Sequence, residues 1–191
     1  ARALRSVLRQ DPDIVLIGEI RDEETADIAI KFSLTGHLVF TTLHANDAPS
    51  TITRLLDIGV PSYLVASSLN LVMAQRLVRK ICKHCIDDYK PTNDELNDAG
   101  ISQEEAGKIS FKKGRGCVHC DNTGYSGRTG IFEVMEVTAE IRKLIFNGED
   151  QDNIRDLAIK NGMMTLHDSA LHKMKLGLTS INEVIKLTIS D

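Results

Sequence analysis

The four cysteines of this chain are arranged as two C-x-x-C pairs, Cys82 with Cys85 and Cys117 with Cys120. This spacing lets two thiolates bind one tetrahedral metal ion, so two such pairs together provide four sulfur ligands. Because four thiolates fill the coordination shell of Zn²⁺, no open position for catalysis is expected. The pattern therefore predicts a structural zinc site, with free or redox-active cysteines as the alternative.

The segment between the two pairs explains why a metal would be useful there. Residues 87–110 are mainly polar and cannot form a hydrophobic core of their own. A bound metal would replace the stabilisation that such a segment cannot obtain from apolar burial. Each pair also contains a histidine, His84 or His119. Both are possible ligands, but four thiolates are sufficient.

A carboxylate that could act on a phosphate stands at Glu19. It directly follows a short apolar run, residues 13–18, in the sequence D-I-V-L-I-G-E-I-R-D. A strand that ends in a carboxylate is what a Walker B site requires, because the strand fixes the carboxylate beside the phosphates, where it can orient water. A glutamate that only faces solvent is the alternative. Gly18 also stands where an ordinary Walker B site has a metal-coordinating Asp.

Two histidines flank the next apolar run, residues 37–43, within the sequence T-G-H-L-V-F-T-T-L-H-A-N-D. His44 follows the run and His37 begins it. A histidine at the end of a strand can donate a hydrogen bond to a γ-phosphate or respond to its loss. The alternative for either residue is a structural histidine whose ring nitrogens are satisfied by backbone groups.

The elements that must position these groups form a βαβ unit. Residues 13–18 form an apolar run rich in β-branched side chains, which predicts a parallel strand buried on both faces. Acidic residues open a helical segment at 23–34, and residues 37–43 predict a second strand. In a βαβ unit both strands end at the same edge of the sheet, where ligands bind. We therefore expect Glu19 and His44 to be neighbours.

The rest of the chain is predicted to be mainly helical. Residues 75–81 lead into the first cysteine pair, residues 87–110 contain one short helix, and residues 131–137 form a strand. Glycines at 162 and 177 are suited to helix C-caps. The remaining segments are expected to be helices: 51–58, 61–74, 139–147, 152–161, 165–176 and 180–189.

Composition excludes several classes of protein. The chain has 191 residues, 42% of them hydrophobic, and a net charge of −4, so a dedicated nucleic-acid binder is not expected. No apolar run reaches the roughly 18 residues of a membrane-spanning helix, and no signal peptide opens the chain. Residues 1–10 have helical spacing from the start. We therefore expect the chain to be a fragment of a longer protein.

Five motifs occur in an order that resembles the secretion ATPase family, the hexameric P-loop ATPases of type II secretion and type IV pilus assembly. They are the G-E-I-R-D of residues 18–22, the T-G-H and T-L-H-A-N-D of 35–47, the A-Q-R-L of 74–77, the paired C-x-x-C, and the G-Y-S-G-R-T-G-I of 124–131. In that family the first two are the atypical Walker B motif and the histidine box. The family shares Gly18, and its tetracysteine insertion binds zinc.

The resemblance implies a role for each matching residue. Glu19 would be the Walker B glutamate, and His44 would be the histidine nearest the nucleotide, so these two are the predicted catalytic residues. Arg21 would form a structural or intersubunit ion pair. The residues assigned to nucleotide binding or to contacts between subunits are His37, Arg21, Arg76, Arg2 and Arg5. For Arg2 and Arg5 a solvated helix face is the alternative.

Two family elements do not occur in the chain, the P-loop and the acidic segment that the family has between the P-loop and the Walker B motif. No G-x-x-x-x-G-K-[ST] sequence is present, and this P-loop supplies the backbone cradle and the lysine that bind phosphates. We therefore expect the chain as given to bind ATP poorly and not to hydrolyse it, whereas a parent protein with Mg²⁺ and ATP would.

The predicted fold is α/β: part of a RecA-like parallel sheet at 1–81, a zinc-binding subdomain at 82–127, and a C-terminal strand and helical subdomain at 128–191. The implied partners are ATP, five further copies in a homohexamer, and an inner-membrane platform protein, with no nucleic acid. The implied location is cytoplasmic, peripheral on the inner membrane. The alternative is a zinc-stapled interaction module without catalytic activity, which leaves Glu19 and the histidine box unexplained.

Overall fold

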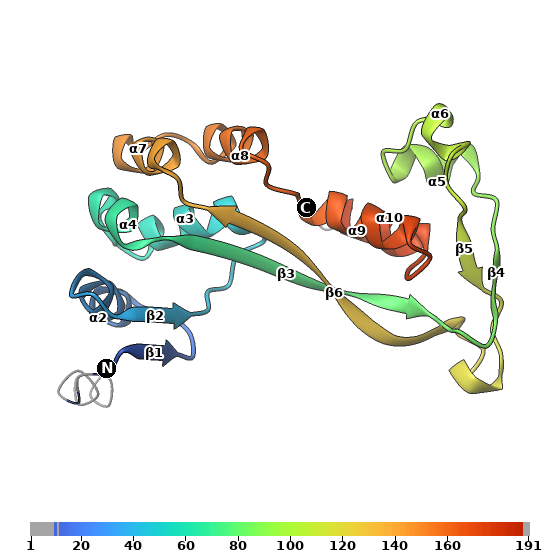
Figure 1. Ribbon diagram of the computed structural model, residues 1–191, viewed down its shortest axis with the longest axis horizontal. Helices are drawn as coiled ribbons and strands as arrows, with labels where there is room; N and C mark the ends of the chain where they lie inside the picture. Colours follow the sequence, from blue (N-terminus) through green and yellow to red (C-terminus); the bar gives the residue numbers. More distant parts are fainter. Residues whose placement is uncertain (1–9, 11, 189–191) are drawn as a thin grey trace. The chain divides into compact units, whose positions relative to one another are not determined.

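The first two strands pair in parallel, as the βαβ prediction requires. β1 (Ile14–Ile17) runs beside β2 (Leu38–Thr41), with Ile14 opposite Leu38 and Ile17 opposite Thr41. Helix α2 (Glu23–Leu34) connects them and has the predicted bounds. Asp22 caps it by accepting a hydrogen bond from the backbone N–H of Thr25 at 2.8 Å. Figure 1 shows the two strands side by side, with α2 next to β2.

These features come from a computed structural model that describes residues 10 and 12–188. The chain divides into two compact units. The first contains residues 1–74 and 134–163, and the second contains residues 75–133 and 164–191.

One face of the parallel pair is buried and the other is open. In β1, Val15 and Ile17 are buried, whereas Ile14 and Leu16 are 61% and 77% exposed. The prediction that this strand is buried on both faces is therefore wrong for the described chain. The run is apolar on both faces, but the described residues cover only one of them.

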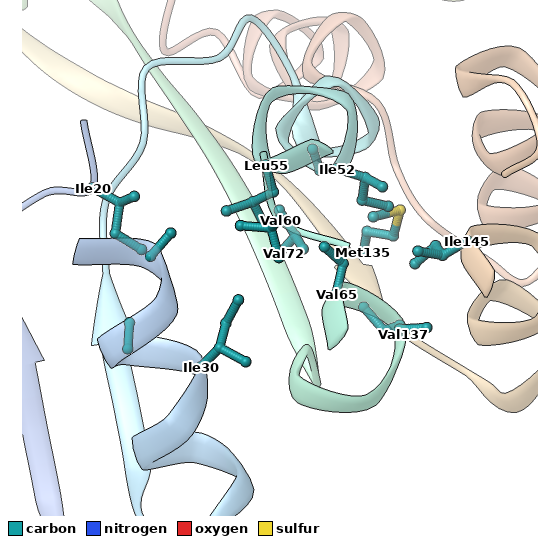
Figure 2. Packing of buried hydrophobic residues seen from close by; sticks show 14 of the residues in the cluster. Ile20, Ile30, Ile52, Leu55, Val60, Val65, Val72, Met135, Val137 and Ile145 are labelled. Atoms are coloured by element: carbon teal, nitrogen blue, oxygen red, sulfur yellow. The ribbon is translucent and has the colours of Figure 1, made fainter. Parts of the chain in front are cut away.

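Four helices complete the first unit: α3 (Ala48–Asp57), α4 (Ser62–Ser68), α7 (Ala139–Asn147) and α8 (Gln151–Lys160). α4 packs against α7, and α3 packs against α8. Their apolar faces join those of β1 and α2 in one hydrophobic core. Figure 2 shows part of this core, in which Val60 lies beside Val72 and Ile52 lies beside Met135.

The predicted helix at 61–74 is wrong after Ser68. α4 ends there, Leu69 has extended backbone angles, and the chain continues as strand β3 (Leu71–Ile81). Buried and exposed residues alternate at the start of this strand, as expected when one face packs on a core. β3 pairs with β6 (Tyr125–Glu136), which begins six residues earlier than the predicted strand.

The second unit contains the cysteine pairs. Strands β4 (Ile86–Asp88) and β5 (Lys112–Gly114) are antiparallel, with Asp87 opposite Lys113. Two short helices lie between them where one was predicted, α5 (Asn93–Asp98) and α6 (Gln103–Ala106), each opened by a capping box. A single 3₁₀ turn, η2 (Val118–Cys120), spans the second cysteine pair.

The second unit ends with α9 (Leu166–Lys175) and α10 (Ile181–Thr188), which pack on each other. Gly162 and Gly177 follow α8 and α9 with φ of +99° and +70°, as their predicted role at helix ends requires. Glu183 of α10 binds Arg79 of β3 through the arginine backbone N–H at 2.9 Å and its Nη2 at 2.8 Å. This pair fixes α10 on β3.

Candidate functional site

Glu19 and His44 meet at the carboxyl ends of β1 and β2. The Nε2 atom of His44 lies 3.1 Å from Oε2 of Glu19, although 25 residues separate them in sequence. The parallel register explains this contact, because it brings the residues after both strands to one edge of the sheet. The His44 side chain is 87% exposed and that of Glu19 is 31% exposed, so both can be reached from solvent.

The backbone around this pair is held by hydrogen bonds between the two strand ends. The N–H of Ile20 donates to the carbonyl of Thr42 at 3.0 Å. The Thr42 hydroxyl donates to the carbonyl of Gly18 at 2.6 Å. Because Ile20 is also buried in the core, Glu19 leaves the sheet from a fixed position. Such preorganisation is what a group that must orient a reactant needs.

Arg21 binds the other oxygen of Glu19. Its guanidinium forms an ion pair with Oε1, while His44 holds Oε2. The Arg21 guanidinium keeps the pKa of Glu19 below its ordinary value, and the hydrogen bond from His44 acts in the same direction, whereas partial burial opposes both. Glu19 is therefore ionised at neutral pH, the state in which a carboxylate can accept a proton or orient water.

His37 is not part of this cluster. It precedes β2, at the opposite end of the strand from His44. Its Nδ1 lies 3.1 Å from the carbonyl oxygen of Phe32 and 3.0 Å from the hydroxyl of Thr35, and its ring packs edge-on against Phe32. In the described chain His37 thus joins β2 to the C-terminal end of α2, and its assignment to nucleotide binding stays a prediction.

Three further arginines were predicted to bind nucleotide: Arg76, Arg2 and Arg5. Arg76 lies in β3, in the part of that strand that belongs to the second unit. Arg2 and Arg5 lie outside the described residues. Their roles also stay predictions.

The four cysteines converge on one point of the second unit. All four sulfur atoms lie within 4.8 Å of one another. The Sγ–Sγ distances are 3.9 Å for Cys82–Cys117, 3.8 Å for Cys85–Cys120 and 3.7 Å for Cys117–Cys120. Four sulfurs placed about 2.3 Å from a tetrahedral Zn²⁺ are about 3.8 Å apart. The donor set and its spacing therefore fit a tetrahedral metal ion.

Backbone donors surround the sulfur of Cys120. The N–H groups of Cys117 and Gly124 each donate to it at 3.3 Å. Burial raises the pKa of the Cys120 thiol, but these two hydrogen bonds and those to the side chains of Cys117 and Cys85 together lower the pKa to about 7. Cys85 has fewer such donors, and burial raises its pKa to about 12. Backbone N–H groups directed at a sulfur favour its thiolate, which is the form that binds metal.

The turn that carries the second pair depends on glycine. Gly124 has φ of +78°, and a Cβ there would lie 2.5 Å from the carbonyl oxygen of Gly114, so any side chain would clash with backbone. His84 and His119, considered above as possible ligands, are instead stacked on each other with ring centroids 4.1 Å apart.

Two residues beside Glu19 and His44, namely Arg21 and Thr42, have contacts that were not predicted. The sequence indicates an ion pair for Arg21 but not its partner, and Thr42 was not singled out. The pairing of Arg21 with Glu19 could have been predicted from the sequence, because the two residues have opposite charges and flank Ile20, which is buried. For Thr42, a hydroxyl near the end of a strand is too common to be informative.

Within the described residues, no helix has both the length and the apolar character needed to cross a bilayer. The described chain is an α/β protein with a polar site at the edge of a parallel strand pair and a second site formed by four cysteines. The profile of the type II/IV secretion system protein family matches residues 1–186, and the chain belongs to this family. The family expected from the motifs is confirmed.

The curated relatives belong to pilus assembly and secretion machines. The chain is 46% identical to the type IV pilus assembly ATPase PilB of Myxococcus xanthus, over all of this chain and 34% of that protein. It is 47% identical to PilB of Thermus thermophilus, over 99% of the chain and 21% of that protein. Type II secretion system protein E of Pseudomonas aeruginosa is 43% identical over 98% of the chain and 37% of that protein. The chain therefore spans about a third or less of the first two relatives.

Two known structures share the fold. The pilus retraction motor PilT, whose crystal structure contains ADP, is 26% identical with a TM-score of 0.66, over 98% of this chain and 43% of PilT. The ATPase DotB of Legionella pneumophila, 22% identical, has a TM-score of 0.64 over 98% of this chain and 41% of DotB, which shows likeness of fold alone. The predicted α/β class is confirmed.

Proposed function

We propose that this chain is the C-terminal portion of a longer ATPase that couples ATP hydrolysis to type II secretion or type IV pilus assembly. The observation that carries the proposal is the 3.1 Å contact between Glu19 and His44 at the shared end of two parallel strands. It supports the assignment of G-E-I-R-D as a Walker B motif and of T-L-H-A-N-D as a histidine box. The names of the relatives support the reaction.

In this proposal the reaction is in-line attack of water on the γ-phosphate of ATP. Glu19, ionised and held at the strand end, orients or activates the water. His44, the more exposed partner, places a ring nitrogen where it can bind a γ-phosphate oxygen. Mg²⁺ bound together with ATP would supply positive charge to balance the charge of the phosphoryl oxygens. Since the sequence contains no G-x-x-x-x-G-K-[ST] pattern, we expect the chain by itself to bind ATP poorly and not to hydrolyse it.

The βαβ unit would be part of a RecA-like sheet. The open face of the β1–β2 pair supports this, because Ile14, Leu16, Leu38 and Phe40 are apolar and 48–77% exposed. Such a face needs a cover, which further parts of the parent protein would provide. Residues 1–81 would then belong to the ATPase core, 82–127 to the zinc-binding subdomain, and 128–191 to the C-terminal subdomain.

Zn²⁺ would be held by Cys82, Cys85, Cys117 and Cys120. It would cross-link two segments of the second unit and supply no catalytic group, since four thiolates complete its shell. The sulfur spacing supports this assignment.

The parent protein would work as a homohexamer on the cytoplasmic side of the inner membrane, acting on a platform protein there. Its nucleotide sites would lie near subunit boundaries. His37, Arg76, Arg2 and Arg5 are proposed for contacts with nucleotide or with a neighbouring subunit.

The test is steady-state ATP hydrolysis by the longer parent protein with the substitution Glu19→Gln. Glutamine keeps the size and most hydrogen bonding of glutamate but lacks its charge, so it tests chemistry rather than packing. We expect turnover to fall at least about a hundredfold while ATP still binds.

Glu104→Gln is the matched control. Glu104 is 84% exposed on α6, where it forms an ion pair with the nearby Lys108, so its loss should leave turnover unchanged. Full turnover of the Glu19→Gln protein would place the catalytic carboxylate elsewhere and leave Glu19 as only the residue that follows β1 and Gly18.

A further inference from the structure

The position of Arg21 is fixed by its neighbours on both sides. Ile20 is buried and its N–H is bonded to Thr42, while Asp22 caps α2 through Thr25. Arg21 stands between these two anchored residues, with its own side chain 73% exposed. The backbone therefore presents the arginine at the strand edge without using its guanidinium for packing.

Glu19 and Arg21 lie on either side of the buried Ile20. With the isoleucine directed into the core, the two charged side chains lie outside it and reach each other. Arg21 and His44 are the two charged or titratable groups that face the Glu19 carboxylate in the described chain, one at each oxygen.

We propose that Arg21 is a positioning residue for Glu19: it holds one carboxylate oxygen while His44 holds the other, so that the carboxylate has a single direction before substrate arrives. This inference rests on the proposed function of Glu19. A guanidinium is suited to the task because its planar fork fixes orientation as well as charge. A carboxylate with only one partner would be free to rotate about its terminal torsion.

The same contact sets the charge of Glu19. Partial burial disfavours the carboxylate, whereas Arg21 and His44 favour it, and Arg21 has the larger effect. When Arg21 is removed, the pKa of Glu19 must rise. A carboxylate with a raised pKa becomes protonated at a higher pH, so any activity that needs the ionised form is lost sooner as the pH falls.

The first experiment uses this chain and no nucleotide. The pKa of Glu19 is measured by NMR from the pH dependence of its side-chain carboxyl carbon, in the wild type and in Arg21→Gln. We expect a higher pKa in Arg21→Gln and an intermediate one in Arg21→Lys, which keeps the charge but loses the fork. Arg54→Gln, which removes an exposed arginine of α3 that forms no ion pair with Glu19, should leave the pKa unchanged. An unchanged pKa in Arg21→Gln overturns the proposal.

The second experiment measures the pH profile of ATP hydrolysis in the longer parent protein. In Arg21→Gln the acidic limb of kcat should move to higher pH, and kcat at neutral pH should fall about tenfold with less change in KM. Arg21→Lys should recover part of the loss. A purely structural role would lower the amount of folded protein without moving the acidic limb.

The two proposals fail in different ways. If Glu19→Gln hydrolyses ATP at the full rate, the proposed function of Glu19 is wrong whatever the titration shows. If Glu19→Gln is inactive but Arg21→Gln has the wild-type acidic limb and kcat, then Glu19 is catalytic and Arg21 does not position it.

Discussion

At the scale of single residues, Glu183 is a buried carboxylate whose pKa is strongly lowered by its partners. Its side chain is 7% exposed and binds the Arg79 guanidinium, the Arg79 backbone N–H and Lys186. Burial raises the pKa of Glu183, but the hydrogen bonds from Arg79 and Lys186 outweigh it and lower the pKa to about 2. The Arg79 guanidinium also lies 3.9 Å from the centre of the Tyr125 ring.

The ion pair of Glu183 with Arg79 should make the free energy of unfolding depend on pH in the acidic range. A glutamate has an ordinary pKa of about 4.3 in an unfolded chain. Because folding lowers that value, the carboxylate stabilises the fold above about pH 4.3, and this contribution is lost as the pH falls toward 2. We expect Glu183→Gln to lower the free energy of unfolding at pH 7 by about 1–3 kcal/mol. The variant should also lose part of the acid dependence.

Urea unfolding at several values between pH 7 and pH 2.5 measures both effects. Glu104→Gln, at an exposed ion pair, is the control and should change the free energy of unfolding by less than about 0.5 kcal/mol. If the wild type and Glu183→Gln lose stability in parallel as the pH falls, the buried pair is not the source of the acid dependence.

The sequence predicts a contact between site residues where the backbone leaves them few alternative positions. Glu19 and His44 were predicted as neighbours because two parallel strands leave few positions for the residues that follow them. The cysteines were predicted because their spacing is itself the signal. The partner of Arg21 and the place of His37 depend on side-chain packing and could not be derived from spacing.

At the scale of elements, helix α3 illustrates how much one cap can matter. Asp47 accepts a hydrogen bond from the backbone N–H of Ser50 at 2.8 Å, and the Ser50 hydroxyl accepts one from the Asp47 N–H at 3.1 Å. The other oxygen of Asp47 is paired with Arg155 of α8. The cap thus also joins two helices of the first unit.

We expect Asp47→Ala to lower the free energy of unfolding by about 1–2 kcal/mol, because the helix loses its cap and Arg155 loses its partner. Thermal or urea unfolding measures this. Asp57→Ala removes an exposed carboxylate at the other end of α3 and should be neutral or slightly stabilising, since a negative charge is unfavourable at a helix C-terminus. If Asp47→Ala is no less stable than Asp57→Ala, the cap and its pairing with Arg155 contribute little to stability.

Elements with clear end signals were predicted well. α2 and α7 have the predicted bounds, because Asp22 and Thr138 cap their first turns and Gly148 follows α7 with φ of +72°. The helix predicted at 61–74 failed because residues 69–74 contain no Gly or Pro to mark its end. Their change to a strand depends on pairing with β6, which lies more than 50 residues away in sequence. Local patterns do not carry such information.

At the scale of the whole molecule, the region around the cysteines differs from the first unit in what stabilises it. The first has a continuous hydrophobic core that includes Phe32, Ile52 and Val65, all nearly inaccessible. In the second, β4 and β5 form a pair of three-residue strands beside the cysteines. Strands this short are marginal without further support. The sequence could not predict this division, because β3 and β6 each continue from one unit into the other.

Removing the metal should therefore affect the units unequally. We expect about one Zn²⁺ per chain by elemental analysis. Treatment with a strong chelator should abolish protection of backbone amides from hydrogen exchange in β4 and β5, while α2 and the other helices of the first unit keep theirs. The reason is that the first unit has its own core, whereas the cysteine region depends on its cross-link. Cys85→Ser should behave like the chelated wild type.

His84→Ala is the control that separates metal binding from other effects of substitution near the cysteines. Its ring stacks on that of His119 rather than joining the sulfur cluster, so the variant should keep its zinc and the protection of β4 and β5. Loss of zinc in this variant would make the histidine a ligand and the four-thiolate shell wrong. Uniform loss of protection in both units after chelation would show that the metal supports the whole fold, because the core of the first unit would then be insufficient by itself.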